Sequence, residues 1–172
     1  MNEATEKLTD NLGECGLPLA LEMMGDRWSF MILRAAFNGV CHFEQFLDAL
    51  GIARNILSNR LTRMVEGGIM RREPCPEDRR KIEYRLTEKG ADLLPAMLAL
   101  RQWGERHGLG VPSNPVLVDK QSRQPIADIG IFAQDGRRIG WQDLLWQDRS
   151  ELGKPDLECC GPPEIPALQR AR

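Results

Sequence analysis

The side chains best suited to chemistry form a basic cluster in the middle of the chain. Residues 52–85 carry nine basic side chains and five acidic ones, although the whole chain has a net charge of -2. Arginine and asparagine can each make two hydrogen bonds to a purine edge in the major groove of DNA, and lysine and arginine neutralise phosphates. Because local charge decides what a surface attracts, this segment predicts binding to a polyanion.

Groups suited to catalysis are sparse by comparison. The two histidines, His42 and His107, have no serine or carboxylate pattern that would mark a nucleophile and its base, and the chain lacks a glycine-rich phosphate loop. Cys41 and His42 are neighbours, but two adjacent side chains supply too few ligands for a metal ion, so a packed thiol is the favoured interpretation. We therefore expect no enzyme, no metal site and no cofactor.

The five cysteines form no recognisable framework. They are scattered, odd in number and never in C-x-x-C spacing, which argues against a set of disulfides or a zinc ribbon. Cys75 falls in a turn-rich loop, where we expect it to be exposed and open to alkylation, with a plain loop residue as the favoured interpretation.

Two predicted helices position the basic cluster. Apolar periodicity predicts helices over residues 43–50 and 54–66, with Gly51 in the break between them. Two helices joined by a short turn that contains glycine are typical of a helix-turn-helix. Upstream, we expect a short helix over residues 17–24 and a buried helix that Asp26 caps.

The second helix of this pair has an apolar face and a polar face. Successive residues turn by about 100°, which places Leu57, Leu61 and Met64 together and leaves amide, hydroxyl and arginine side chains opposite them, without an acid. The first turn and a half of such a helix usually touches bases. The candidates for base contact are Arg54, Asn55, Ser58 and Asn59, and those for phosphate contact are Arg60 and Arg63.

A hairpin is expected directly after the helix pair, and such a hairpin is called a wing. Residues 69–73 and 81–86 are the predicted strands. Apolar residues alternate in the second strand, so we expect three side chains to face the core: Ile82, Tyr84 and Leu86. Three cations at the loop tip are expected to reach the sugar-phosphate backbone or a narrow minor groove: Arg79, Arg80 and Lys81.

Residues 87–107 predict one long helix after the wing. Thr87 can cap this helix, and Pro95 should bend it. An apolar seam runs along it through Leu93, Met97, Leu100 and Gly104. This spacing suits pairing with a second copy of the chain.

The predicted fold is mainly α with a small β-hairpin wing (α+β): a winged helix-turn-helix with a C-terminal β-hairpin extension. In the extension we expect strands over residues 116–118, 126–132 and 137–141, with a turn at Asp135-Gly136. The predicted organisation is a flexible N-terminus (1–14), a DNA-binding and dimerisation domain (15–107), a linker (108–115), a β-rich extension (116–146) and a disordered tail (147–172). The extension could cover a dimer or form an effector pocket, and its residues do not distinguish between these two interpretations.

The chain carries no signal for membrane insertion or secretion. No apolar run approaches about 18 residues, and the first seven residues lack the basic and then apolar stretches of a secretion signal. We therefore expect a cytoplasmic protein.

Several motifs occur in order and resemble the HxlR family of winged-helix transcriptional regulators over about residues 15–107. The opening motif is Cys15-x-x-Pro18-x-x-Leu21-x-x-Met24-Gly25-x-x-Trp28-x-x-x-Ile32-Leu33. Further matches are Phe43-x-x-Phe46-Leu47, Leu57-x-x-Arg60-Leu61, Gly67-Gly68-Ile69-x-x-Arg72, Glu83-Tyr84-x-Leu86-Thr87-x-x-Gly90 and Leu100-x-x-Trp103-Gly104.

This resemblance implies a homodimer that binds double-stranded operator DNA, usually as a repressor and sometimes as an activator. It places Arg54, Asn55, Ser58, Asn59 and Arg60 on the recognition helix, and Arg79, Arg80 and Lys81 on the wing. The sequence departs from the family at Ala53, where a serine commonly caps the recognition helix, and this weakens the cap.

The resemblance also makes Cys15 a candidate sensor, because several family members use a cysteine at this position to detect oxidants or electrophiles. A helix N-terminus just after the thiol favours the reactive thiolate, while Glu14 and Glu22 oppose it. A packing role for Cys15 is the alternative. Two other interpretations stay open for the protein: a regulator that senses a small molecule without thiol chemistry, and a winged-helix module that binds a protein partner.

Overall fold

The computed structural model describes residues 15–108, 114–147, 150 and 152. The chain divides into two compact units, residues 1–126 and 127–172, which are described separately below. The expected flexible N-terminus, most of the linker and most of the C-terminal tail lie outside the described residues. Among those that are described, no helix is both long and apolar enough to cross a bilayer.

The first two described helices lie where the sequence predicts them. Helix α2 spans Gly16–Met24, and helix α3 spans Arg27–Phe37. Asp26 caps α3, because its side chain accepts hydrogen bonds from the backbone N–H groups of Trp28 and Ser29 at 3.0 and 3.1 Å. The expected N-cap is thus confirmed.

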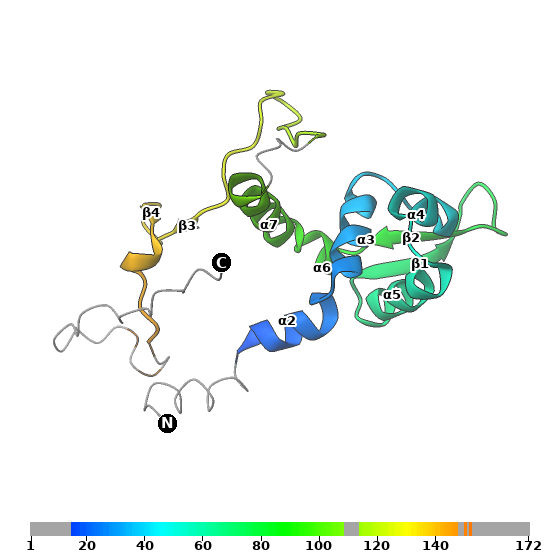
Figure 1. The fold of residues 1–172 in the computed structure, drawn as a ribbon, viewed down its shortest axis with the longest axis horizontal. Helices are drawn as coiled ribbons and strands as arrows, with labels where there is room; N and C mark the ends of the chain where they lie inside the picture. Colours follow the sequence, from blue (N-terminus) through cyan, green and yellow to red (C-terminus); the bar gives the residue numbers. More distant parts are fainter. Residues whose placement is uncertain (1–14, 109–113, 148–149, 151, 153–172) are drawn as a thin grey trace, which may run out of the picture. The chain divides into compact units, whose positions relative to one another are not determined.

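The predicted helix pair has the expected bounds. Helix α4 spans Phe43–Leu50 and helix α5 spans Arg54–Glu66. Gly51 ends α4 with φ of 59°, a left-handed conformation that glycine adopts without a steric penalty. Helices α3, α4 and α5 pack against one another beside the wing (Figure 1). Their shared core contains Ile32, Leu33, Phe46, Leu57, Leu61 and Met64.

Strands β1 (Met70–Pro74) and β2 (Ile82–Leu86) form the antiparallel wing, in which Met70 pairs with Leu86 and Pro74 pairs with Ile82. The loop between them extends beyond the helices in Figure 1. The fold class predicted from the sequence, a mainly α winged helix-turn-helix with a small hairpin, is confirmed.

Two expectations about the wing are wrong. Glu83 is the most buried residue of β2, at 4% exposure, although the alternation places it on the outer face. Cys75 is buried at 6% exposure instead of exposed. Both side chains turn towards the start of α4, because a β-bridge pairs His42 with Glu83 and closes that side of the strand.

The single long helix predicted over residues 87–107 is also wrong. Thr87 caps a short helix α6 (Glu88–Ala91), and a second helix α7 then spans Leu94–His107. Pro95 lies in the first turn of α7, where its missing N–H costs no hydrogen bond. Proline therefore starts a new helix here instead of bending a continuous one.

The β-rich extension is smaller than expected. Residues 116–118 contribute an isolated bridge, Val118 with Pro125, and no full strand. In the second unit, β3 (Ile131–Phe132) and β4 (Arg138–Ile139) form a short antiparallel hairpin. A 3-10 turn, η2 (Trp141–Asp143), follows it. The C-terminal hairpin is thus confirmed, but both of its strands are shorter than predicted.

Candidate nucleic-acid interface

Helix α5 presents a polar face to solvent, as its periodicity predicts. Leu57, Leu61 and Met64 point into the core and are at most 1% exposed. Glu66, at the C-terminal end, is the one acid in the helix. The exposed side chains include Arg54, Asn55, Ser58, Asn59, Thr62 and Arg63. A helix with such a face fits the major groove of DNA.

Arg54 begins α5 and is held by two groups from α4. Its guanidinium donates to both carboxylate oxygens of Glu44, at 2.9 and 2.8 Å, and lies 5.2 Å from the centre of the Phe43 ring. The hydrogen bond from Arg54 holds the pKa of Glu44 below its usual value, so both groups are charged at neutral pH. This pair presets the direction of Arg54, but it also puts an acid beside the first turn of α5.

The other two arginines of α5 contact the N-terminal helices. Arg60 Nε lies 3.2 Å from Asp26 Oδ1, and the Arg60 side chain is only 23% exposed. Arg63 donates to the backbone oxygen of Glu22 at 2.7 Å. Both contacts join α5 to the segment around the start of α3. Arg63 stays exposed, whereas a phosphate contact by Arg60 would require its ion pair to open.

Asp26 connects the cap of α3 to helix α5. Burial alone would raise the pKa of Asp26. Hydrogen bonds from the side chain and backbone of Ser29, the charge of Arg60 and the N–H of Trp28 outweigh burial and hold the pKa of Asp26 below its usual value. The charged carboxylate is therefore part of the folded state at neutral pH.

The tip of the wing carries the expected cations. Arg79, Arg80 and Lys81 are all exposed. Arg80 donates from its backbone N–H and its Nε to Asp78 Oδ1, at 3.1 and 3.2 Å, and this contact lowers the pKa of Asp78. Arg80 remains 91% exposed, so its outer nitrogens stay accessible to a phosphate.

A second group of titratable side chains lies where the wing meets α4. Ligand atoms of Cys41, His42 and Glu83 are all within 4.8 Å of one another. A hydrogen bond from Arg85, helped by one from Cys75, outweighs burial and holds the pKa of Glu83 below its usual value. Burial and the negative charge of Glu83 raise the pKa of the Cys41 thiol. Sequence reasoning missed the burial of Glu83 and Cys75. A charged residue at an alternating position of a strand is expected to face solvent, and a cysteine in a turn-rich loop is expected to be exposed.

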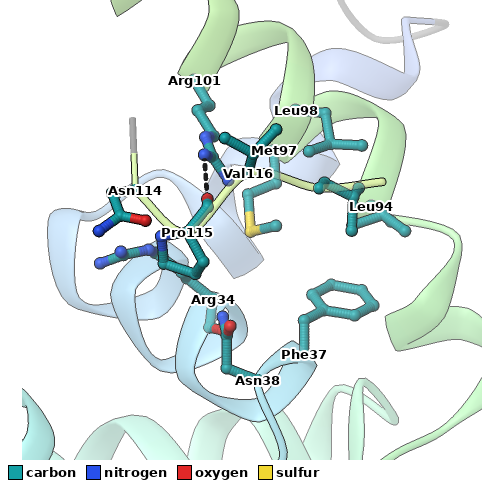
Figure 2. Close-up of a pocket in the computed structure, with 11 residues that line it drawn as sticks. Arg34, Phe37, Asn38, Leu94, Met97, Leu98, Arg101, Asn114, Pro115 and Val116 are labelled. Carbon is teal, nitrogen blue, oxygen red and sulfur yellow. Dashed lines mark hydrogen bonds between the residues drawn. The ribbon is translucent and has the colours of Figure 1, made fainter. Parts of the chain in front are cut away.

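A cavity of about 320 Å³ lies between the end of α3, helix α7 and residues 114–117 (Figure 2). Phe37, Leu94 and Met97 give it apolar walls. Arg34 and Arg101 also line it, and Arg101 donates to the backbone oxygen of Pro115 at 2.5 Å. An apolar cavity with cations at its rim suits a small amphipathic anion.

Cys15 stands just before α2 as predicted and is exposed. Exposure makes the thiol accessible to a soluble oxidant. Among the described residues, no hydrogen bond or ion pair joins Cys15 to another predicted site residue.

The helix pair and wing match a known family. The sequence profile of the HxlR-like helix-turn-helix family matches residues 23–110, which cover α3 to α7. The chain belongs to this family.

Similar proteins agree with this assignment. The HTH-type transcriptional regulator Rv3095 of Mycobacterium tuberculosis is 48% identical over 96 residues, which cover 56% of this chain and 60% of that protein. The HTH-type transcriptional regulator sll1512 of Synechocystis is 32% identical over 91 residues, or 52% of this chain and 67% of that protein. This chain therefore spans about 60% of the length of its mycobacterial relative.

Solved structures extend the similarity beyond the family domain. The crystal structure of PA1607, described as a candidate transcription factor, superposes with a TM-score of 0.74 at 36% identity and covers 81% of this chain and 98% of its own. PA1374 from Pseudomonas aeruginosa gives a TM-score of 0.55 at 32% identity, and the match covers 78% of this chain and 92% of PA1374. Solved candidate transcription factors thus share the fold of this protein.

Proposed function

We propose that this protein is a sequence-specific DNA-binding transcriptional regulator that acts as a homodimeric repressor. The observation that carries the proposal is the pairing of an exposed, amide-rich face of α5 with a cationic wing tip in one family domain. Nine residues are assigned to the DNA surface: Arg54, Asn55, Ser58, Asn59, Arg60, Arg63, Arg79, Arg80 and Lys81. Arg60 is the weakest of these assignments, because Asp26 already holds its guanidinium.

A division of labour follows from the chemistry of these side chains. Asn55 and Asn59 can form paired hydrogen bonds with base edges and so provide sequence preference. Arg79 and Arg80 lie exposed at the wing tip, where we expect them to contact phosphates, so they provide affinity that falls steeply with salt.

Two exposed apolar surfaces support the proposed homodimer. Leu17, Leu19 and Leu21 of α2 are 54–66% exposed, and Leu100 and Trp103 of α7 are 55% and 60% exposed. Large apolar side chains rarely gather on a monomer surface without a partner. A dimer also allows the two recognition helices to reach half-sites about one helical turn apart.

The proposal is tested by selecting binding sites from genomic DNA with the full-length protein. We expect recovery of an inverted repeat, and affinity for it that declines steeply between about 50 and 200 mM salt. A protein-interaction module would instead show no affinity for any duplex at about 50 mM salt. That result would favour the alternative function.

We propose Cys15 as an oxidant-responsive thiol because it is exposed and precedes α2. The test compares operator affinity before and after diamide or quinone treatment in the wild type, in Cys15→Ser and in Cys41→Ser as a control for a less exposed thiol. We expect only Cys15→Ser to lose the response. An equal response in all three proteins would remove Cys15 from the mechanism.

The cavity at Arg34 supports a second mode of sensing, by a small amphipathic anion. If this mode operates, an aromatic carboxylate should change operator affinity in the wild type but not in Arg34→Ala. Arg27→Ala, which removes an exposed arginine at the other end of α3, is the matched control.

A further inference from the structure

We propose that Cys41, His42, Glu83 and Cys75 form a binding site for a divalent transition-metal ion of the zinc class at the base of the wing. Cys41 and His42 alone supply too few ligands. The fold adds Glu83 from β2, and the buried Cys75 thiol, just after β1, lies near its carboxylate.

The spacing of the potential ligands is close to that of a metal site. The ligand atoms of Cys41, His42 and Glu83 all lie within 4.8 Å of one another. Bonds of roughly 2.0–2.3 Å in a tetrahedral zinc site place neighbouring ligand atoms about 3.3–3.8 Å apart. Small side-chain rotations are therefore enough to close these three ligands around an ion, and Cys75, which lies outside this 4.8 Å group, is the proposed fourth ligand.

His42 is oriented as a metal ligand usually is. Its Nδ1 lies 3.1 Å from the backbone oxygen of Ile82, which can only accept a hydrogen bond, so Nδ1 carries a proton. In the neutral imidazole, Nε2 then holds the lone pair, and this atom faces Glu83 Oε1 at 3.8 Å. That distance is too long for a hydrogen bond. A metal ion between Nε2 and Oε1 would bind both atoms, and this arrangement is compatible with such a site.

Glu83 is held in a matching way. Its Oε2 accepts from Arg85 Nε at 2.6 Å, which leaves Oε1 directed towards His42. Metal ligands are typically held by a hydrogen bond to the side-chain atom that does not bind the metal. At 4% exposure, Glu83 is also shielded from competing water.

The donor set indicates the class of ion. Two thiols, an imidazole and a carboxylate suit zinc and similar borderline ions, whereas magnesium and calcium prefer oxygen ligands. Binding would release the proton of each coordinating thiol. Because the ligands come from the start of α4, from β2 and from the loop after β1, an ion here would link the wing to the first helix of the helix-turn-helix.

Cobalt titration of the full chain tests the site. Cysteines outside the group are first removed by Cys15→Ser, Cys159→Ser and Cys160→Ser, so that Cys41 and Cys75 are the remaining thiols. We expect one Co²⁺ per chain, with thiolate-to-cobalt charge-transfer bands and intense tetrahedral d–d bands, and displacement of Co²⁺ by Zn²⁺. Adding Cys41→Ser or Cys75→Ser should weaken binding at least about tenfold, while His107→Gln, a histidine outside the group, should leave it unchanged.

Absence of stoichiometric binding, or cobalt spectra without thiolate bands, would overturn the proposal. Equal binding after Cys41→Ser, in protein shown by circular dichroism to be folded, would also overturn it. A measurement on the wild type avoids any folding defect: Zn²⁺ should protect Cys41 from N-ethylmaleimide and leave Cys15 reactive, and equal labelling of Cys41 with and without Zn²⁺ would contradict the site. None of these readouts involves DNA, so they test the metal site separately from the proposed function.

Discussion

At the scale of single residues, two carboxylates outside helix α5 form ion pairs with its arginines. Asp26 caps α3 and pairs with Arg60, whereas Glu44 pairs with Arg54 at the exposed start of α5. The first pair is half-buried and structural. The second lies where DNA is proposed to bind, so the two carboxylates should respond differently to removal.

Replacing Asp26 should lower stability in a pH-dependent way. We expect Asp26→Ala to cost about 1–2 kcal/mol at pH 7, through loss of the cap and the contact with Arg60. Because folding lowers the pKa of Asp26, its contribution is present above the ordinary value of 3.8 and is lost as the pH falls through the lower value of the folded state. Urea unfolding at pH 7 and in acid should therefore show a smaller acid loss for the variant than for the wild type. An equal acid loss in both would contradict this role.

Replacing Glu44 should strengthen general DNA binding. In Glu44→Gln the carboxylate that repels phosphates is gone and Arg54 is free to turn to DNA, so we expect several-fold tighter binding to an unrelated duplex at low salt, fading as salt screens the charge. Stability should hardly change, since the pair is exposed. Glu66→Gln, at the opposite end of α5, is the control. Equal effects of both variants on fluorescence anisotropy would count against a DNA surface at the start of α5.

At the scale of elements, the local sequence pattern predicts the helices well. Long-range contacts determine which residues of the wing are buried, and the local pattern does not predict this. The bounds of α4 and α5 follow from apolar spacing and from Gly51. The burial of Glu83 does not follow from local spacing, because it depends on a β-bridge to His42, which lies 41 positions earlier in the sequence. The break between α6 and α7 has a local cause that the prediction of one continuous helix overlooks. Pro95 fits the first turn of a helix better than a helix interior.

The same contrast explains why the exposed polar side of α5 could be predicted and the cluster around Glu83 could not. Residues of α5 share one helix, so their faces follow from a turn of about 100° per residue. Glu83 and Cys75 meet Cys41 and His42 only after the wing has folded onto α4.

The contact between α6 and the wing gives a prediction at this scale. A Cβ on Gly90 would lie 2.1 Å from the backbone oxygen of Ile69. Gly90→Ala should therefore destabilise the domain by about 1–3 kcal/mol, which thermal unfolding would measure. Gly16→Ala is the matched control, because a Cβ there meets nothing within 4 Å. If both variants melted alike, close packing of α6 on the wing would be wrong.

At the scale of the whole molecule, the proposed function requires two copies. Leu100 and Trp103 are exposed on α7, so the folded monomer should tolerate charge at these positions. We expect the double variant Leu100→Glu, Trp103→Glu to sediment as a monomer and to bind operator at least about tenfold more weakly. A variant that stayed dimeric would place the interface elsewhere.

The most direct test of the proposed DNA surface compares two double variants on the selected operator and on a scrambled duplex. Asn55→Ala with Asn59→Ala should weaken operator binding while leaving affinity for the scrambled duplex nearly unchanged. Arg79→Ala with Arg80→Ala should weaken both duplexes alike and reduce the salt dependence. If the two double variants behaved identically, or if neither changed binding, α5 and the wing would not read DNA as proposed.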